Sequence, residues 1–208
     1  MSQPPLDDTG VAAAARILAA RDPDLGAIVA RHGPPPTWAR PAGFATLVAI
    51  ILEQQVSLGS GAAALGRLER AAGALEPAAI VALGEDGARA AGQTRQKARY
   101  VVELAAATLD GRFDQVAVAD AEDDEARAAL SSLLGVGRWT ADIYLLMALG
   151  RPDVWPDGDL ALAAAMRRAK RLASLPDRET QHAIAAEWRP YRAVAARILW
   201  QAYLAGER

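Results

Sequence analysis

The sequence predicts an all-α fold, and two features of its composition lead to this prediction. Alanine, a strong helix former, is abundant, and apolar residues repeat at helical spacing along much of the chain. Runs of β-branched or aromatic residues that alternate strictly with polar ones, as strands require, are scarce. The chain has 208 residues, of which 52% are hydrophobic and 23% charged, so it can bury a real core and is not expected to be disordered.

In the first third of the chain, proline and glycine mark the ends of the expected helices. Asp22-Pro23 ends the first helix, and Arg31-His32-Gly33 closes the second. The triplet Pro34-Pro35-Pro36 then forms a stiff connector, since consecutive prolines hold an extended conformation. A strongly apolar helix follows, and Leu58-Gly59 separates it from the next. We expect these four helices over residues 6–20, 25–30, 44–56 and 60–72.

The remaining helices are bounded in the same way. Gly92 ends one helix, Thr94 can cap the long helix after it, and residues 111–114 read as a turn. The segment 123–134 is amphipathic, with Ala126 and Leu130 on its apolar side. We expect helices over residues 77–83, 86–91, 95–109, 123–134, 138–149, 160–173, 178–187 and 190–204.

Residue counts exclude several kinds of site. The chain has no cysteine, which excludes disulfides, zinc–thiolate sites, iron–sulfur clusters and thiol nucleophiles. His32 and His182 are the only imidazoles, so a histidine-rich metal site is excluded as well. The longest apolar run, Phe44–Leu52, is too short to span a bilayer, and the start of the chain does not resemble a signal peptide. We therefore expect a cytoplasmic protein.

The average charge gives a weak argument against a nucleic-acid partner. The formal net charge is −2 and the isoelectric point is about 5.7. Local patches matter more than this average, however, and of the 23 basic residues only Lys97 and Lys170 are lysine. The remaining arginines suit bidentate contacts to phosphate.

Two neighbouring segments carry residues suited to chemistry. The first, Leu133-Leu-Gly-Val-Gly-Arg-Trp-Thr-Ala-Asp142, predicts a tight turn between two helices, in which Gly135 and Gly137 allow positive φ and Val136 points inward. Amides exposed at the start of the second helix could bind a phosphate, although an ordinary interhelical turn would contain the same glycines. The second, Trp155-Pro-Asp-Gly-Asp-Leu-Ala-Leu162, places Asp159 before a helix, where it can act as an N-cap or as a reactive carboxylate.

Taken together, these segments resemble the helix-hairpin-helix (HhH-GPD) DNA glycosylase superfamily, in which a hairpin of the type LPGVG is followed by a helix and an essential aspartate. Leu134 stands where the family usually has proline. Residues 44–57, 92–100 and 188–200 also resemble the branch of 3-methyladenine DNA glycosylase II, whose N-terminal β-rich domain this chain is expected to lack. The resemblance implies one glycosylase unit over residues 1–208, with the hairpin at 123–149, a catalytic loop at 150–159, and two helical lobes with the cleft between them.

The resemblance also implies a role for each matching residue. Asp159 is expected to be catalytic, with Asp157 as a rival carboxylate that would only cap the loop. Trp139 and Trp200 are expected to line a pocket for the damaged base, with Tyr144 as a lesser candidate. For Trp200 a place in the core is an equal alternative, and Trp188 is assigned to the core. The residues expected to contact DNA are Gln54, Gln55, Gly135, Gly137, Arg138 and Thr140, with Gln55 at the intercalating position.

The expected activity is hydrolysis without strand cleavage. Superfamily members that also cut the strand carry a lysine just after the hairpin, and this chain has Trp139 there. The resemblance implies double-stranded DNA with alkylated bases, of the 3-methyladenine and 7-methylguanine type, as the partner. A monovalent cation on hairpin carbonyls is its only implied cofactor. We expect a monomer, since no heptad seam is evident.

Two alternative functions remain open at this stage. The same pocket aromatics would suit deaminated or etheno purines, because pocket shape decides between these bases. A non-catalytic sensor of DNA damage would use the same hairpin, but it would not need the carboxylate of Asp159.

Overall fold

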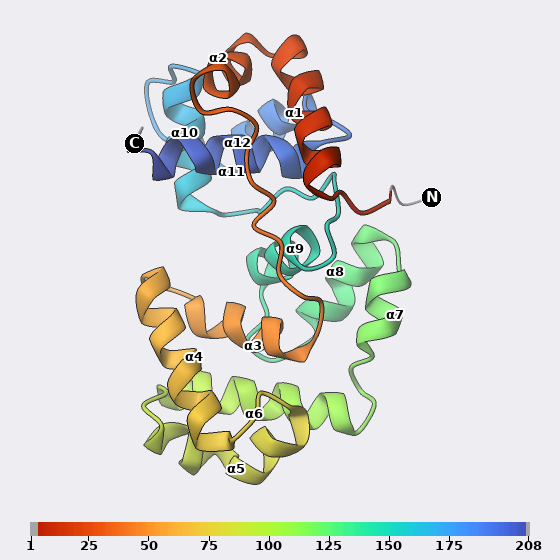
Figure 1. Ribbon diagram of the computed structural model, residues 1–208, viewed down its shortest axis with the longest axis vertical. Helices are drawn as coiled ribbons and strands as arrows, with labels where there is room; N and C mark the ends of the chain where they lie inside the picture. The colour runs from red at the N-terminus through yellow and green to blue at the C-terminus, as the bar shows by residue number, and fades with distance from the viewer. Residues whose placement is uncertain (1–3, 207–208) are drawn as a thin grey trace. The chain divides into compact units, whose positions relative to one another are not determined.

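The computed structural model describes residues 4–206, and every regular element in that part of the chain is an α-helix, which confirms the predicted fold class. No helix within these residues is long and apolar enough to cross a membrane. The helices, drawn in Figure 1, are α1 (Asp8–Arg21), α2 (Pro23–His32), α3 (Phe44–Glu53), α4 (Leu58–Ala72), α5 (Pro77–Ala90), α6 (Arg95–Leu109), α7 (Gln115–Asp120), α8 (Asp123–Ser131), α9 (Arg138–Met147), α10 (Leu160–Ala169), α11 (Arg178–Ala186) and α12 (Arg192–Leu204).

The sequence predicted most of these helices, and the differences have local causes. Helix α3 ends three residues earlier than expected, because the chain turns at Gln55, whose φ is +58°. Helix α10 ends before Arg171, which also has a positive φ of +53°. The two helices expected between residues 77 and 91 are joined as α5, with a break at Gly84. Helix α7 was missed, since six residues are too few to show a helical repeat.

The chain divides into two compact units. Unit 1 contains Met1–Ala39 and Leu145–Arg208, and unit 2 contains Arg40–Tyr144. The division falls within α9, so this helix begins in unit 2 and ends in unit 1.

Unit 2 is built around α3, the most apolar helix. Its core residues include Leu47, Ile50 and Leu52, which are fully buried, and it packs against α4 and α6. The start of α3 is fixed by Tyr144, whose hydroxyl accepts a hydrogen bond from the Gly43 amide at 3.0 Å. Burial raises the pKa of Tyr144, which therefore remains a neutral phenol at physiological pH.

Unit 1 is built around α12, which packs against α1, α2, α10 and α11 (Figure 1). Small residues such as Ala195 and Ala196 are buried along it and allow close packing. Arg197 is also buried in this helix, and burial lowers the pKa of its guanidinium to about 10. The guanidinium donates hydrogen bonds to the carbonyl oxygens of Thr37 at 2.8 Å, Leu146 at 2.8 Å and Ala193 at 3.3 Å.

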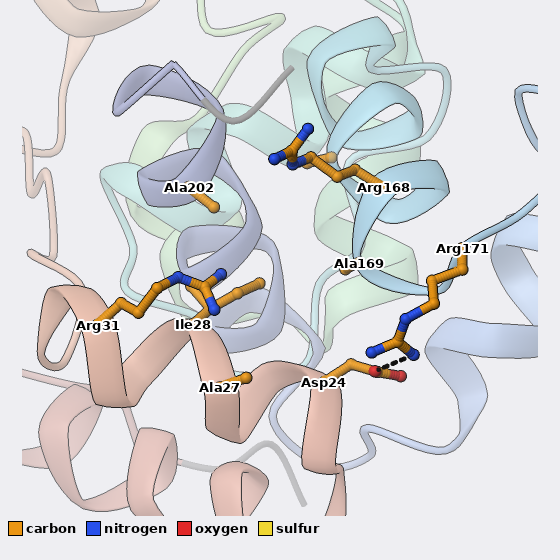
Figure 2. A pocket seen from close by; sticks show the side chains of 9 residues that line it. Asp24, Ala27, Ile28, Arg31, Arg168, Ala169, Arg171 and Ala202 are labelled. Atoms are coloured by element: carbon orange, nitrogen blue, oxygen red, sulfur yellow. Dashed lines mark hydrogen bonds and ion pairs between the residues drawn. The ribbon is translucent and has the colours of Figure 1, made fainter.

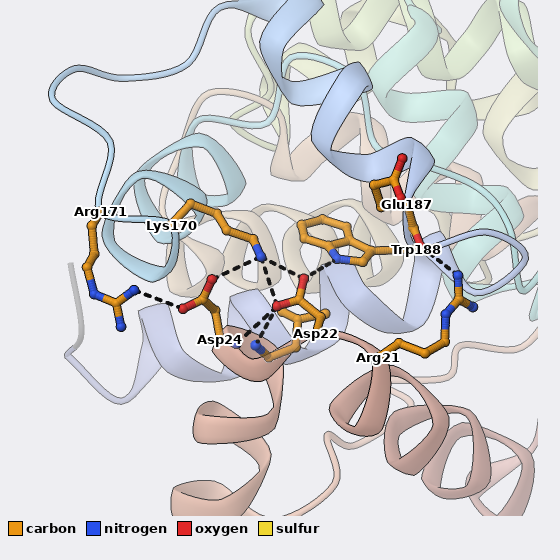
Figure 3. A network of polar contacts seen from close by, with 8 residues as sticks. Arg21, Asp22, Asp24, Lys170, Arg171, Glu187 and Trp188 are labelled. Atoms are coloured by element: carbon orange, nitrogen blue, oxygen red, sulfur yellow. Dashed lines mark hydrogen bonds and ion pairs between the residues drawn. The ribbon is translucent and has the colours of Figure 1, made fainter.

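A polar cluster around Asp22 joins three segments of unit 1 (Figure 3). Asp22 caps α2 by accepting hydrogen bonds from the amides of Asp24 and Leu25. Its carboxylate also accepts from Lys170 Nζ at 2.7 Å and from the indole Nε1 of Trp188 at 2.6 Å. Burial alone would raise the pKa of Asp22, but these donors outweigh it and hold the pKa below its usual value.

This cluster leads to a prediction about stability. Asp22→Asn should lower the free energy of unfolding at neutral pH by about 2–4 kcal/mol, because it leaves the half-buried Lys170 with one carboxylate fewer. Since the pKa of Asp22 is lowered on folding, its contribution is complete above pH 3.8 and is lost as the pH falls further. Urea unfolding between pH 3 and 7 measures the difference in unfolding free energy between the wild type and the variant.

The matched control is Asp177→Asn. Asp177 caps α11 through the Thr180 amide at 2.9 Å but has no ion pair in the described residues, and asparagine caps a helix equally well. We expect little change in stability for this variant. Equal losses for the two substitutions would contradict the importance of the Lys170 pair.

Candidate functional site

The predicted turn between α8 and α9 is present in unit 2. Val136 is buried, as expected. Of the two glycines only Gly135 has a positive φ, of +83°, and a Cβ there would overlap the ring of Tyr100. Gly137 has no positive φ and is exposed, with nothing within 4 Å of a Cβ placed on it, so the expectation that both glycines serve the reversal is wrong for Gly137. A ligand could approach the backbone closely at this position.

The hairpin is tied to the loop that follows α3. The Nε2 of Gln54 donates hydrogen bonds to the Gly135 carbonyl and to Thr140 Oγ1, both at 2.9 Å. Lys97 Nζ donates to the carbonyls of Leu52 at 2.7 Å and Gln54 at 3.0 Å, and burial lowers the pKa of this lysine. The side chains of Gln54 and Thr140, both expected to contact DNA, are thus engaged with one another inside unit 2.

Gln55 differs from its neighbour, because its side chain is exposed and its backbone lies in the left-handed region. A residue other than glycine rarely adopts this conformation, and such outliers are concentrated at functional positions. Val56 and Leu58 beside it are 45% and 66% exposed. These two apolar side chains were not predicted from the sequence, although Val56 directly follows Gln55.

Arg138 and Trp139 begin α9 beside the hairpin. The Arg138 side chain is 55% exposed, and its Nε lies 4.0 Å from Asp142 Oδ2. Asp142 itself is fully buried, and its other oxygen accepts a hydrogen bond from Arg127 Nε at 2.6 Å. Trp139 is half-buried. A cation is therefore exposed at the N-terminus of this helix, where an anion would also be favoured by the helix amides.

In unit 1, Asp159 is the N-cap of α10. Its Oδ1 accepts a hydrogen bond from the Leu162 amide at 2.8 Å, which confirms the capping interpretation. The same oxygen lies 3.4 Å from the indole Nε1 of Trp200. The carboxylate is only partly buried, so capping does not remove it from contact with a ligand.

A second tryptophan completes this arrangement. Trp38 packs against Trp200 with their ring centroids 6.4 Å apart and their planes at 70°. Trp38 is half-buried, whereas Trp200 is only 8% exposed. We call Asp159, Trp200 and Trp38 the aromatic corner. Trp38 was not predicted from the sequence, because nothing local distinguishes a tryptophan after a proline connector.

The loop that carries Asp159 is firmly held within unit 1. Asp153 forms a two-point ion pair with Arg192 of α12, at 2.9 and 3.0 Å. Trp155 is buried and packs against Trp188, whose centroid lies 5.7 Å away, so the assignment of Trp188 to the core is confirmed. The carboxylate of Asp159 therefore sits at the end of an ordered loop.

The rival carboxylate, Asp157, has a different environment. It is 6% exposed, and its Oδ1 lies 3.1 Å from Arg178 Nε and 3.4 Å from His182 Nε2, both on α11. Its carboxylate therefore holds the loop against α11. This favours Asp159 as the carboxylate available to a ligand.

Tyr144, the lesser pocket candidate, is 2% exposed and bonded to Gly43. This gives it a structural task within unit 2. Its contact with a substrate, like that of Trp139, stays a prediction.

A separate pocket of about 430 Å³ lies among α2, α10 and α12 (Figure 2). Arg31, Arg168 and Arg171 surround a small apolar floor, and Arg171 is paired with Asp24 at 3.1 Å. The pocket adjoins the C-terminal end of α10, whereas Asp159 is at its N-terminal end. It shares no residue with the aromatic corner.

The structure offers little to a metal ion. Within residues 4–206, no three histidine, aspartate or glutamate side chains are grouped so that they could hold one. The Gly135 carbonyl is engaged by Gln54, and the Leu133 carbonyl by the Val136 amide at 3.1 Å. The monovalent cation on hairpin carbonyls stays a prediction.

Comparison with known proteins yields one family match. The model described as HhH-GPD superfamily base excision DNA repair protein matches residues 48–190. A probable bifunctional transcriptional activator/DNA repair enzyme AlkA of Mycobacterium tuberculosis is 33% identical across 86% of this chain and 37% of its own length. The chain likewise spans 37% of a putative DNA-3-methyladenine glycosylase of Bacillus subtilis, so it covers little more than a third of these curated relatives.

Two solved structures have the same fold. The 3-methyladenine DNA glycosylase Mag1 of Schizosaccharomyces pombe, in complex with abasic DNA, superimposes with a TM-score of 0.80 at 23% identity, covering 90% of this chain and 95% of its own. A DNA-3-methyladenine glycosidase of Bacillus halodurans gives a TM-score of 0.72 at 26% identity, covering 89% and 92%.

The hairpin geometry predicts that the same substitution costs much more stability at Gly135 than at Gly137. Gly135→Ala should cost about 2 kcal/mol or more of unfolding free energy, because it combines a left-handed backbone with a clash against Tyr100. Gly137→Ala, the matched control, should cost less than about 1 kcal/mol, since its Cβ meets no atom. Thermal unfolding of the two variants compares them. A loss at Gly137 as large as that at Gly135 would refute this account of the turn.

Proposed function

Because the chain belongs to the HhH-GPD superfamily of base excision DNA repair proteins, we propose that it is a DNA glycosylase that removes alkylated bases from double-stranded DNA. The expected bases are of the 3-methyladenine and 7-methylguanine type. The observation that carries this proposal is the partly exposed carboxylate of Asp159 beside the indole of Trp200, at the end of a firmly held loop.

The first step of the proposed reaction is extrusion of the damaged base. A glycosidic bond inside the base stack is out of reach, so the enzyme must flip the nucleotide out of the duplex. Gln55 is proposed as the side chain that fills the gap, where its amide can bond the orphaned base. The exposed Val56 beside it adds apolar surface for wedging between base pairs.

The hairpin is proposed to hold the DNA backbone. The amides at the start of α9 and the exposed guanidinium of Arg138 suit a phosphate. Gln54 and Thr140 then act by fixing the hairpin to the loop of Gln55, through the two hydrogen bonds described above. The proposed DNA-binding surface of unit 2 thus contains four polar residues with different tasks, namely Gln54, Gln55, Arg138 and Thr140.

Bond cleavage is proposed to depend on the aromatic corner. An alkylated purine carries positive charge, which favours the face of an electron-rich ring and weakens the bond to the sugar. That bond breaks with both electrons leaving on the base, so the base departs neutral and needs no proton. Asp159 stabilises the positive charge that develops on the sugar and orients the attacking water. The water oxygen bonds to C1′, and its proton passes to Asp159 or to solvent.

The proposed enzyme is monofunctional. Strand cleavage through a Schiff base needs a free amine at the site, and the chain has only two lysines. Lys97 donates to two carbonyls in unit 2, and Lys170 is held between Asp22 and Asp24 in unit 1. Both lysines thus have structural tasks, which supports hydrolysis alone.

Asp159→Asn provides the direct test of this mechanism. Asparagine is as good an N-cap as aspartate, so α10 and the unfolding free energy should be retained. Release of 3-methyladenine and 7-methylguanine from methylated duplex DNA should fall by about 100-fold or more, because the developing charge loses its carboxylate. Chromatography of the released bases measures the rate, and strand breaks should appear only after alkali.

Other outcomes would point to other functions. Release of hypoxanthine or ethenoadenine, but not of methylated bases, would replace the proposed substrate class. Binding to damaged DNA without any release by the wild type would make the protein a damage sensor. Strand breaks without alkali would refute the monofunctional proposal.

Arg138→Ala tests the proposed phosphate contact. The variant should bind undamaged duplex DNA more weakly, and the slope of log affinity against log salt should fall by about one unit. Fluorescence anisotropy at several salt concentrations measures the slope. Arg70, exposed on α4 of the same unit, supplies a control substitution that should leave the slope unchanged.

A further inference from the structure

We propose that Lys97 is a positioning residue for base extrusion, because its ammonium fixes the peptide that precedes Gln55 and so holds this side chain ready to enter the duplex. This inference rests on the proposed function, in which Gln55 is the wedge that fills the gap left by the flipped base. Lys97 need not touch DNA for this task, since it acts through the loop that follows α3.

The first argument is that Gln55 does not hold its own conformation. Its φ is +58°, in the left-handed region that a residue other than glycine rarely adopts, and its side chain is exposed. With the residues that the structure describes, Gln55 forms no hydrogen bond. Backbone strain of this kind persists only where the surroundings impose it. The peptides on either side of Gln55 must therefore hold it in place.

The second argument is that Lys97 holds the peptide on one side of Gln55. Its Nζ donates to the Leu52 carbonyl at 2.7 Å and to the Gln54 carbonyl at 3.0 Å, which belongs to the peptide bond that leads into Gln55. Among the described residues, no other group donates a hydrogen bond to the Gln54 carbonyl. On the far side of the loop, Ser57 is fixed as the N-cap of α4. Lys97 therefore anchors the end of the loop from which Gln55 projects.

The third argument is that the anchored residue also carries the contact with the hairpin. The Nε2 of Gln54 donates to the Gly135 carbonyl and to Thr140 Oγ1, both at 2.9 Å. The loop is thus held through its backbone by α6 and through a side chain by the hairpin. Since the hairpin is the proposed phosphate-binding element, the wedge can push against the base stack only while both attachments hold.

The fourth argument is the cost of placing an ammonium at this position. Lys97 is half-buried, burial lowers its pKa, and no carboxylate among the described residues pairs with it. Burying a cation without a counter-charge is unfavourable. The last carbonyls of α3 lack partners within the helix and form the negative end of its dipole, so they favour a cationic donor. An apolar side chain could fill this space at lower cost, which indicates that the ammonium has a task at the end of α3.

The test is a double-mutant cycle between Lys97 and Gln55. Lys97→Met keeps an unbranched stem without a donor, and Gln55→Ala removes the wedge. Single-turnover release of 7-methylguanine from duplex DNA should fall by about 10-fold or more in each single variant. In the double variant, Lys97→Met should lower the rate by less than about twofold relative to Gln55→Ala alone, because no wedge remains to be positioned. Lys97→Gln, which keeps a neutral donor, enters the same cycle if Lys97→Met does not fold.

Gln93→Met is the matched control. The Nε2 of Gln93, just before α6, donates to the Ala64 carbonyl of α4 at 2.8 Å, so this substitution also removes a donor from a main-chain carbonyl, but away from the loop of Gln55. It should lower the unfolding temperature as Lys97→Met does and leave the release rate within about twofold of wild type. Equal losses of rate in the two variants would make the role of Lys97 purely structural and overturn the proposal. Additive losses in the cycle would overturn it as well.

Fluorescence of 2-aminopurine distinguishes failure of this inference from failure of the proposed function. The probe is placed beside a tetrahydrofuran abasic site in a duplex, where a side chain that enters the stack raises the fluorescence without any bond cleavage. A rise with wild type that is lost in Lys97→Met supports the inference even if no base is released. An equal rise with both proteins, together with base release by wild type, would leave the glycosylase standing and refute the role of Lys97. No rise with either protein would remove the wedge and the inference with it.

Discussion

The candidate site of unit 1 depends on the hydrogen bonds that the buried guanidinium of Arg197 donates. Its hydrogen bonds go only to carbonyl oxygens, so no carboxylate within the described residues offsets its charge. Such a group is costly to bury, and the cost is tolerated because three segments gain a shared donor. These segments are the connector before Trp38, the end of α9 and α12 itself. This one side chain therefore ties the peptide before Trp38 to the helix that carries Trp200.

Asp159 illustrates how one residue can satisfy two demands. Its carboxylate caps α10 by accepting a hydrogen bond from the Leu162 amide. The same carboxylate places a charged oxygen beside the indole of Trp200, as the proposed chemistry requires. The amide that holds this carboxylate also restricts its rotation. Capping therefore prepares this group for the proposed reaction, and the two interpretations of the sequence were never exclusive.

Features that depend on neighbouring residues along the chain could be predicted from the sequence. Helix positions, the inward Val136 and the cap at Asp159 all follow from local spacing. Contacts between residues that are far apart in the sequence could not be predicted. The contacts of Gln54 cross more than 80 positions, and those of Arg197 cross up to 160. The left-handed backbone of Trp38 directly follows the peptide that Arg197 contacts. Periodicity carries no information about such pairs.

Helix α10 is anchored at both ends, by Asp159 at its start and by the ion pair of Lys170 with Asp22 at its finish. It behaves as a rod of fixed length, of roughly 15 Å for its ten residues. Adding or deleting one residue within it would rotate one end against the other by about 100°. Either the carboxylate or the lysine would then face the wrong way. The number of residues between Asp159 and Lys170 is therefore fixed by the two contacts at the ends of this helix.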